Sequence, residues 1–432
     1  MNFLDIIEKK KNGEELSEEE IVYFINKYTG DEIPDYQAAA LIMAICINGM
    51  TSDEILALTK AMAESGDIID LSDIADIIVD KHSTGGIGDK ITLIISPIIA
   101  ALGIPVAKLS GRGLGITGGT IDKLESIPYY NVNLSIDEFK QNVRDIKLAL
   151  MAQTLNLTPA DKKIYALRDV IGCVDSIPLI ASSIMSKKIA SGANRIMLDV
   201  TCGKGSFLKT KEQAKSLAKL MTLIGEWSGK ETKCIITNMD EPLGYAVGNS
   251  LEVIEAVKAL KGEMAEDIKD VILNMGVFMI KLAGCGNDIT INKKKILEVI
   301  EDGSAYEKFK ELVVRQGGDV TYIEDLQKFE KAPIIIPLIA ETEGYVEELD
   351  ANIVGRIVLD LGAGRKEKED IIDTRVGIIF SKKIGDEVSN GDVLAYVHAS
   401  DAEKAAIALQ DLRIAYKIGD RIIKKKNIIE IL

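Results

Sequence analysis

The sequence contains few residues of several types, and each scarcity excludes a class of site or of protein. Histidine occurs only 2 times and cysteine only 5 times in 432 residues. The cysteines have no metal-ligand spacing and most lie inside apolar stretches, which predicts reduced thiols rather than disulfides or a metal site. No apolar run is long enough to cross a bilayer, and residues 4–15 are charged too early for a secretory signal. We therefore expect a cytoplasmic protein with no membrane partner.

Positive charge is also in deficit, because 52 Lys and Arg residues face 67 Asp and Glu residues and leave a formal net charge of −15. Binding to a nucleic-acid polymer rests on a basic surface, so the composition argues against that class of partner. An acidic surface also repels small anions at long range. A phosphate site in this chain must therefore be a local concentration of lysines and hydrogen-bond donors.

Two glycine-rich segments supply such a concentration. KHSTGGIGD begins at Lys81, and KLSGRGLGITGGTIDKLE begins at Lys108. Each follows a short β-branched or apolar run, at residues 76–80 and 104–107, so each is predicted to be a loop at the carboxyl end of a strand. Glycines in such loops let backbone N–H groups approach an oxyanion closely. The side chains that we expect to add charge and hydroxyl donors are Lys81, Ser83, Thr92, Lys108, Ser110 and Thr120.

Helical patterns occupy the first part of the chain, up to about residue 65. Ser17 with Glu20, and Thr51 with Glu54, are predicted capping boxes. From residue 76 the pattern changes to strand, glycine loop, helix and strand, which indicates an α/β unit with a parallel sheet.

Helices are predicted again at residues 135–152, 159–169 and 178–190, with Thr158 as the N-cap of the second. Strand and helix then alternate from residue 195 to about 312. This alternation resumes the α/β pattern after a helical excursion. A chain of 432 residues can bury a large core, and we expect two or three domains.

The sequence pattern changes again from about residue 333. Short β-type runs such as GRIVLDL (355–361), residues 375–380 and VLAYVH alternate with Gly, Asp and Lys turns, and one helix is predicted near 402–412. The predicted fold class is α/β: a small all-helical domain, a large α/β domain with a mixed, mainly parallel sheet, and a β-rich C-terminal lobe.

His82 and the pair Ser183 and Lys187 are candidates for chemistry beyond anion binding. An isolated loop histidine more often caps its own turn, but His82 lies between Lys81 and Ser83, and a bound phosphate would favour a protonated imidazole that acts as a general acid. Ser183 and Lys187 are one helical turn apart and project from one face. Alone, such a pair is more often a solvated helix surface.

Three motifs carry a resemblance to a known family. SGRGLGITGGTIDKLE from Ser110, KHSTGG from Lys81 and LRDVIGCVDSIPLIASSIMSKK from Leu167 resemble the signatures of the thymidine and pyrimidine-nucleoside phosphorylase family, in the same order and at similar separation. The likeness runs from the first predicted helix to the C-terminus. Ile116 departs from the pattern, because relatives commonly carry histidine there, so that position is assigned no role.

The resemblance implies the domain organisation. We expect a helical domain at 1–68 that is continued at 156–192, where it binds the base. An α/β phosphate-binding domain is expected at 69–155 and again at 193–332, and a C-terminal α+β lobe at 333–432. The family also forms homodimers through its N-terminal helices, which implies the same for this chain.

The resemblance implies reversible phosphorolysis of a pyrimidine nucleoside by inorganic phosphate, without an organic cofactor. Phosphate attacks the anomeric carbon, and the products are a free pyrimidine and an α-pentose 1-phosphate. His82 protonates or hydrogen-bonds the leaving base at O2. Because the leaving pyrimidine carries negative charge on its polar edge, donors there stabilise the transition state more than the substrate. The residues matching the family's base-binding set are Arg168, Ser183 and Lys187.

Several alternatives stay open. The sugar can be ribose or 2-deoxyribose. Broad pyrimidine specificity is the interpretation that we prefer, and a strictly thymidine-specific phosphorylase is a second hypothesis. A phosphoribosyltransferase of related fold is a third, in which TGGIGD from Thr84 would bind pyrophosphate. Finally, the segment from Lys382 resembles the hairpin of lipoyl and biotinyl carrier domains, but its turn reads HASDA without a lysine to modify, so we expect a carrier-like fold without carrier function.

The resemblance also implies a bound alkali cation, K⁺. The matching ligands are the carbonyls of Gly88, of position 90, of Leu243 and of Ala246, with the carboxylate of Glu255. Broad-specificity relatives often have a hydroxyl side chain at position 90, where this chain has Lys90. Either Lys90 points to solvent and the ion binds normally, or its ammonium pairs with Glu255 and replaces the ion.

Overall fold

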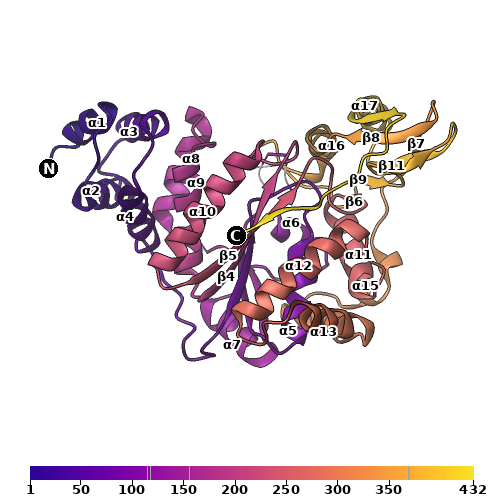
Figure 1. Cartoon of the computed structure of the whole chain (residues 1–432), viewed down its shortest axis with the longest axis horizontal. Helices are drawn as coiled ribbons and strands as arrows, with labels where there is room; N and C mark the ends of the chain where they lie inside the picture. Colours follow the sequence, from indigo (N-terminus) through magenta and orange to yellow (C-terminus); the bar gives the residue numbers. More distant parts are fainter. Residues whose placement is uncertain (114, 117, 155, 368–369) are drawn as a thin grey trace.

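The computed structural model describes residues 1–113, 115–116, 118–154, 156–367 and 370–432. Figure 1 shows helices at one end of the molecule, a sheet flanked by helices in the middle, and a lobe rich in strands at the other end. The predicted fold class is confirmed: a small helical domain, a large α/β domain with a mixed, mainly parallel sheet, and a β-rich C-terminal lobe.

The helical domain takes its helices from two separate stretches of the chain. They are α1 (Phe3–Lys11), α2 (Glu18–Thr29), α3 (Asp35–Asn48), α4 (Ser52–Ala63), α8 (Pro159–Ile171) and α9 (Ile177–Ala190). Both predicted capping boxes are present, at the starts of α2 and α4. Thr158 precedes α8 as predicted, but its hydroxyl makes no cap hydrogen bond. A capping hydroxyl needs extended backbone, whereas Thr158 has a left-handed φ of 49°.

A six-stranded sheet in the order β13-β5-β4-β1-β2-β3 forms the centre of the α/β domain. Its strands are β1 (Val79–Ser83), β2 (Val106–Ser110), β3 (Leu148–Ala152), β4 (Arg195–Cys202), β5 (Glu231–Asn238) and β13 (Ile428–Ile431). All neighbouring pairs are parallel except β13 with β5, so the last strand of the chain returns to this sheet. Parallel strands are covered on both faces, and β2, β3 and β4 are buried almost throughout.

The helix predicted over residues 135–152 is wrong in its second half. The segment forms α7 (Ile136–Ile146) and then β3, and Lys147 ends the helix in the left-handed conformation. The run LALMA has no β-branched residue, so its apolar pattern suits a helix as well as a strand. It becomes a strand because β2 pairs with it along its whole length.

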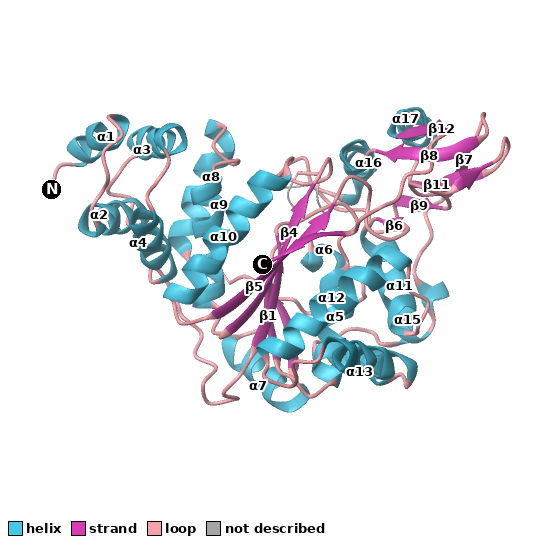
Figure 2. Ribbon diagram, viewed as in Figure 1, coloured by secondary structure: helices cyan, strands magenta, loops and turns pink. Residues whose placement is uncertain are grey.

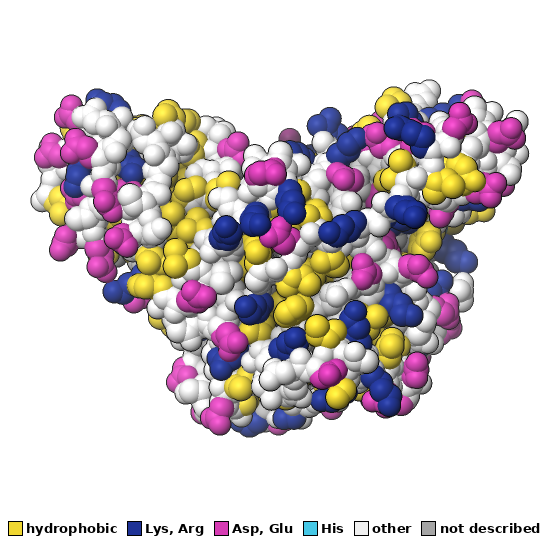
Figure 3. Space-filling view, in the orientation of Figure 1, with side chains coloured by type: hydrophobic (Ala, Val, Ile, Leu, Met, Phe, Trp, Pro, Cys, Tyr) yellow, Lys and Arg dark blue, Asp and Glu magenta, His cyan; other side chains and the backbone are white. Residues whose placement is uncertain are grey.

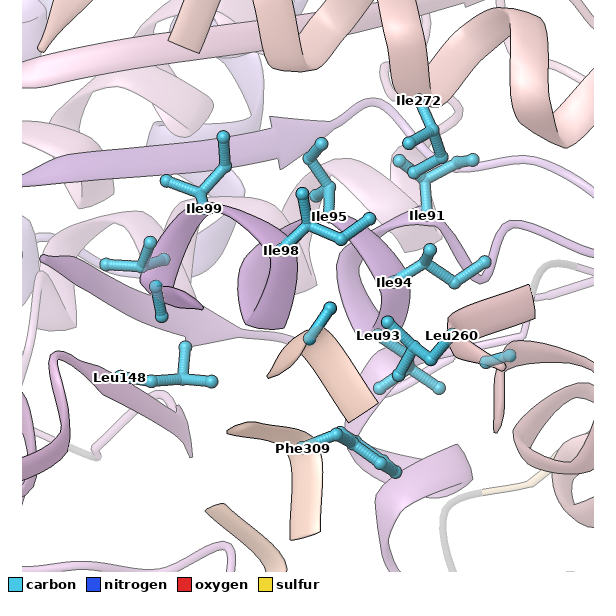
Figure 4. Close-up of a cluster of buried hydrophobic side chains, with 14 of the residues drawn as sticks. Ile91, Leu93, Ile94, Ile95, Ile98, Ile99, Leu148, Leu260, Ile272 and Phe309 are labelled. Atoms are coloured by element: carbon cyan, nitrogen blue, oxygen red, sulfur yellow. The ribbon is translucent and has the colours of Figure 1, made fainter. Parts of the chain in front are cut away.

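Helices cover both faces of the sheet (Figure 2). Besides α7, the helices of this domain are α5 (Ile91–Ala101), α6 (Thr120–Leu124), α10 (Lys211–Trp227), α11 (Asn249–Leu260), α12 (Glu266–Leu282), α13 (Ile289–Glu301), α14 (Ser304–Arg315), α15 (Thr321–Glu324) and a short 3-10 turn (Leu326–Lys328). The core of this domain surrounds α5, which is buried on all sides. Figure 4 shows Ile91 of α5 next to Ile272 of α12 and Leu93 of α5 next to Leu260 of α11. This packing fixes the helix that follows the first glycine loop.

The C-terminal lobe contains two small sheets. Its strands are β7 (Ile334–Ile339), β8 (Gly344–Leu349), β9 (Gly377–Phe380), β10 (Glu387–Val388), β11 (Val393–Ala399) and β12 (Tyr416–Gly419), and β6 (Ala246–Val247) joins one sheet from the α/β domain. The lobe has two helices, α16 (Ala351–Val358) and α17 (Ala402–Ala415). The predicted strand at 355–361 is therefore wrong: it lies in α16 and the following π-type turn (Leu359–Ala363). Its apolar side chains reach the core of the lobe at helical spacing.

The molecule is hollowed between the helical domain and the C-terminal lobe (Figure 3). The carboxyl ends of β4 and β5 are directed toward this side (Figure 2), and β1 and β2 run parallel to them. Ligands of open α/β sheets bind at the carboxyl ends of the strands. No helix in the described ranges has the length and apolarity that a membrane span requires.

Candidate active site

The two glycine loops leave the sheet from adjacent strands, β1 and β2. Both strands run further than predicted, so Lys81, Ser83 and Lys108 lie in the last strand residues rather than in the loops. They do so because β4 pairs with β1, and β3 with β2, up to the strand ends. Among the described residues, β1 and β2 pair with each other only at Val79 and Val106. The two strands thus separate toward the edge where the lysines lie.

Two polar atoms at this edge are buried with no hydrogen-bond partner in the described part of the chain: Lys81 Nζ and Ser110 Oγ. Lys81 is 0% exposed and Ser110 is 4% exposed. The Lys81 ammonium lies between two carboxylates, 3.5 Å from Asp199 Oδ2 and 3.8 Å from Asp89 Oδ1. An unsatisfied buried donor costs about 1–3 kcal/mol. Such atoms mark a place where a ligand can supply the missing acceptor.

Lys108 is a second buried lysine at this edge, and unlike Lys81 it has no counter-ion among the described residues. Its Nζ donates to the Leu109 carbonyl oxygen at 2.9 Å and forms no ion pair with a described residue. Lys188 of α9 donates to the same carbonyl at 3.5 Å and pairs with Asp80 at 2.6 Å. Burial, and then the ammonium of Lys188, lower the pKa of Lys108 well below its ordinary value. The surroundings of Lys108 are therefore short of negative charge.

His82 lies between these lysines on β1. Burial lowers the pKa of its imidazole well below the ordinary value, and the ammonium groups of Lys188, Lys108 and Lys187 lower it further. The imidazole is therefore neutral at neutral pH when no anion is bound. The contacts of Lys188 of α9 with Asp80 and with the Leu109 carbonyl show that the helical domain adjoins β1 and β2 at this point.

The remaining hydroxyls of the predicted anion site lie at the loops. Ser83 Oγ accepts a hydrogen bond from the backbone of Gly85 at 3.2 Å. Thr92 is buried in the first turn of α5, and Thr120 is the first residue of α6. No hydrogen bond between described residues joins Thr92 or Thr120 to Lys81 or Lys108, so their contact with a phosphate stays a prediction.

The second group of candidates lies on α8 and α9. Lys187 Nζ donates to Ser183 Oγ at 2.9 Å, which brings together the two residues one helical turn apart. Lys187 also pairs with Asp161 of α8. Arg168 is 1% exposed, and its guanidinium donates to three backbone carbonyls at the junction of α8 and α9, those of Cys173, Val174 and Leu179. Arg168 thus fixes this junction, and its contact with a base stays a prediction.

Sequence reasoning missed the acidic residues that hold these lysines. Asp80 and Asp199 lie on neighbouring strands, Asp89 ends the first loop, and Asp161 begins α8. Burial raises the pKa of Asp199 to about 6, whereas Lys81 helps to lower the pKa of Asp89 to about 2 against the opposing effect of burial. The sequence could have pointed to Asp80 and Asp199, because an aspartate inside a buried strand requires a charged or hydrogen-bonding partner.

The segment predicted to bind an alkali cation is occupied by a lysine side chain. Lys90 Nζ lies 2.7 Å from the Leu243 carbonyl oxygen, 2.9 Å from that of Ala246 and 2.7 Å from Glu255 Oε2. Ile116, the other departure from the family pattern, packs against the core of the C-terminal lobe.

The chain matches three family models in order along its length. They are the glycosyl transferase family helical bundle domain over residues 4–66, the glycosyl transferase family a/b domain over residues 75–306, and the pyrimidine nucleoside phosphorylase C-terminal domain over residues 345–419. The pyrimidine-nucleoside phosphorylase of Bacillus subtilis is 51% identical over 418 residues, which cover 96% of each chain. That of Staphylococcus haemolyticus is 52% identical over 400 residues, which cover 93% of this chain and 92% of the relative.

The chain belongs to the pyrimidine-nucleoside phosphorylase family. The predicted resemblance is confirmed. One solved structure of similar fold is the anthranilate phosphoribosyltransferase of Thermus thermophilus, with a TM-score of 0.59 over 72% of this chain and 98% of that chain. At 19% sequence identity, this similarity extends to the fold alone.

Proposed function

We propose that the protein is a pentosyltransferase that catalyses reversible phosphorolysis of pyrimidine nucleosides. Uridine, thymidine or 2-deoxyuridine reacts with inorganic phosphate to give a free pyrimidine and α-ribose or α-2-deoxyribose 1-phosphate, with no organic cofactor. The proposal is carried by two buried atoms, Lys81 Nζ and Ser110 Oγ, that have no hydrogen-bond partner among the described residues, and by the Lys108 ammonium, which forms no ion pair with any of those residues. Family membership supports the class of reaction.

Phosphate binds where β1 and β2 separate. A phosphate dianion supplies acceptors for Lys81 Nζ and Ser110 Oγ and a counter-charge for Lys108. Its other oxygens are bound by hydroxyls and backbone N–H groups of the glycine loops, next to the N-terminus of α5. The full set of proposed phosphate-binding side chains is Lys81, Ser83, Thr92, Lys108, Ser110 and Thr120.

The chemical step breaks the bond between the anomeric carbon and the base. A phosphate oxygen attacks that carbon on the face opposite the base through an oxocarbenium-like state, and the electron pair of the broken bond goes to the pyrimidine. Negative charge then develops on the polar edge of the leaving base. Donors at that edge lower the barrier because they bind the transition state more strongly than the substrate.

His82 supplies the proton or hydrogen bond to the base at O2. In the free protein the surrounding ammonium groups and burial hold the pKa of His82 below its ordinary value. A bound phosphate dianion offsets those positive charges and so raises the pKa of the imidazole. His82 therefore becomes a competent acid only after phosphate has bound.

Ser183, Lys187 and Arg168 bind the base. Lys187 and Ser183 already contact each other, and Asp161 holds the Lys187 ammonium in place. Arg168 has five N–H donors, of which three bond to carbonyls in this structure, so two are left for the base. In the family, closure of the cleft between the helical and α/β domains brings base and phosphate together, and we propose the same movement here.

We infer that the protein works in the cytoplasm as a homodimer, on small molecules and not on a nucleic acid or a membrane. The net charge of −15 supports the exclusion of nucleic acid. The helical domain supports the dimer, because α3 exposes Tyr36 by 74% and Ile47 by 75% on one side of the molecule. Sedimentation velocity tests the dimer, and a monomer at micromolar concentration would contradict it.

Base release with phosphate tests the proposed reaction. The protein is incubated with uridine, thymidine or 2-deoxyuridine, with and without phosphate, and the free pyrimidine is measured. We expect phosphate-dependent release from all three nucleosides. Release from thymidine alone would indicate the thymidine-specific alternative. Consumption of phosphoribosyl pyrophosphate with magnesium, without base release, would contradict the proposal and favour a phosphoribosyltransferase.

A further inference from the structure

Lys90 directly follows the first glycine loop and is the N-cap residue of α5. Its side chain is 0% exposed, and the ammonium donates to three oxygens, the Leu243 and Ala246 carbonyls and Glu255 Oε2, at 2.7, 2.9 and 2.7 Å. Burial alone would lower the pKa of Lys90, but the carboxylates of Glu255 and Glu252 overcome that effect and raise it. Lys90 is therefore a permanent buried cation.

The oxygens around this ammonium are held in position by other contacts. Both oxygens of Glu255 accept backbone hydrogen bonds, from Tyr245 at 2.6 Å and from Ala246 at 2.9 Å. Leu243 donates its N–H to the Ile87 carbonyl at 3.0 Å. Gly88 lies so close that an added Cβ would come 2.6 Å from the Leu243 carbonyl oxygen. These three oxygens, which we call the cage, are therefore held in place by contacts that do not depend on the Lys90 side chain.

Two carbonyls and a carboxylate form the kind of oxygen set that binds a hard monovalent cation. An added K⁺ at the same point would overlap the Lys90 ammonium, and the one carboxylate of the cage is already neutralised. The residues present therefore do not fit the free potassium ion that the family resemblance implies.

We propose that the Lys90 ammonium is a tethered cation that takes the place of a free alkali ion. It links the first glycine loop and α5 to the segment before β6 and to α11. Because β6 pairs with β9, the link reaches the C-terminal lobe as well. The protein therefore needs no alkali cation for stability or for holding the phosphate loop.

The unmodified protein gives the first test. Melting temperature and phosphate KM are measured in potassium chloride and in tetramethylammonium chloride of equal ionic strength. We expect the same values in both salts. A several-fold activation by potassium, or a melting temperature that rises specifically with potassium, would overturn the proposal.

Variants at position 90 give the second test, with melting temperature as the readout. Lys90→Ser removes the ammonium and leaves room and a hydroxyl oxygen, whereas Lys90→Met removes the charge but fills the space. In tetramethylammonium chloride we expect both to melt on the order of 5 °C lower than the unmodified protein, because Glu255 loses its counter-ion. Potassium chloride should restore most of the loss in Lys90→Ser and none of it in Lys90→Met.

Lys10→Ser is the matched control. Lys10 is also a buried lysine, but among the described residues its ammonium donates to the carboxylate of Glu54 alone, at 2.7 and 2.9 Å, and to no carbonyl oxygen. We expect this variant to melt at the same lowered temperature in both salts. A Lys90→Ser variant that folds but responds to potassium no more than Lys10→Ser would overturn the proposal. If Lys90→Ser does not fold in either salt, the comparison of salts on the unmodified protein decides.

Discussion

Lys90 and Lys108 are both buried lysines beside the two glycine loops, yet their surroundings differ. Lys90 donates to two carbonyls and a carboxylate, whereas Lys108 donates to one carbonyl and lies near the ammonium of Lys188. Burial lowers the pKa of Lys90, but neighbouring carboxylates outweigh this effect and raise it. For Lys108, burial and the ammonium of Lys188 both lower the pKa. A satisfied cation stabilises the fold, and an unsatisfied one is prepared for a ligand. The missing partner, and not burial itself, therefore distinguishes a binding lysine.

Among substitutions in the candidate ligand-binding site, we expect the largest effect on turnover at His82. We expect His82→Ala to lower kcat by about 10² to 10⁴, the usual contribution of a general acid, with a smaller change in phosphate KM. Steady-state phosphorolysis of uridine measures both constants. His398→Asn, a change of the other histidine in the C-terminal lobe, is the control and should keep its kcat. A His82→Ala protein with nearly full turnover would show that His82 is not the general acid.

Lys81 and Lys108 should control phosphate binding. We expect Lys81→Ala or Lys108→Ala to raise phosphate KM by about 10-fold or more, because a hydrogen bond to a charged group contributes about 1.5–3 kcal/mol. The nucleoside KM, measured at saturating phosphate, should change much less. If both variants keep the phosphate KM of the unmodified protein, these lysines do not bind phosphate.

The two kinds of lysine should respond oppositely to removal of charge. Lys90→Met is expected to melt on the order of 5 °C lower, whereas Lys108→Met should melt at the same or a higher temperature, since it removes a charge that has no counter-ion. The measurement is thermal unfolding without phosphate. Adding phosphate should then raise the melting temperature of the unmodified protein more than that of Lys108→Met. Equal destabilisation by both substitutions would contradict the distinction between them.

The smallest predicted effect is proton uptake when phosphate binds. Burial and neighbouring ammonium groups lower the pKa values of His82 and Lys108 in the free protein, and a bound anion raises both values. Calorimetric titration with phosphate at pH 8, in two buffers of different ionisation enthalpy, should show net uptake of protons, and Lys108→Met should reduce it. Net release of protons would contradict the sign of these shifts.

Part of the candidate site could be predicted because some of its signals are local in sequence. Glycine loops after apolar runs pointed to Lys81 and Lys108. Helical spacing placed Ser183 and Lys187 on one helix face, and the structure shows their contact, but their proposed role came from the family resemblance. The partners of these residues depend on the fold. Asp199 meets Lys81 only because β4 lies next to β1, although the two strands are more than a hundred residues apart in the chain.

The errors in the predicted fold have a similar cause. LALMA in β3 and GRIVLDL in α16 are apolar runs whose composition suits either a strand or a helix. The choice between the two is made by neighbours distant in the sequence: β2 for the first, and the core of the C-terminal lobe for the second. The return of β13 to the main sheet is also set by long-range pairing, here with β5.

Lys81 Nζ and Ser110 Oγ have no hydrogen-bond partner among the described residues, and we propose that phosphate is their partner. A crystal structure of the protein with bound phosphate tests this most directly. We predict a phosphate between the carboxyl ends of β1 and β2, within hydrogen-bond distance of both atoms and of the Lys108 ammonium. A phosphate bound elsewhere, with Lys81 and Ser110 bonded instead to water or to other protein groups, would contradict the account.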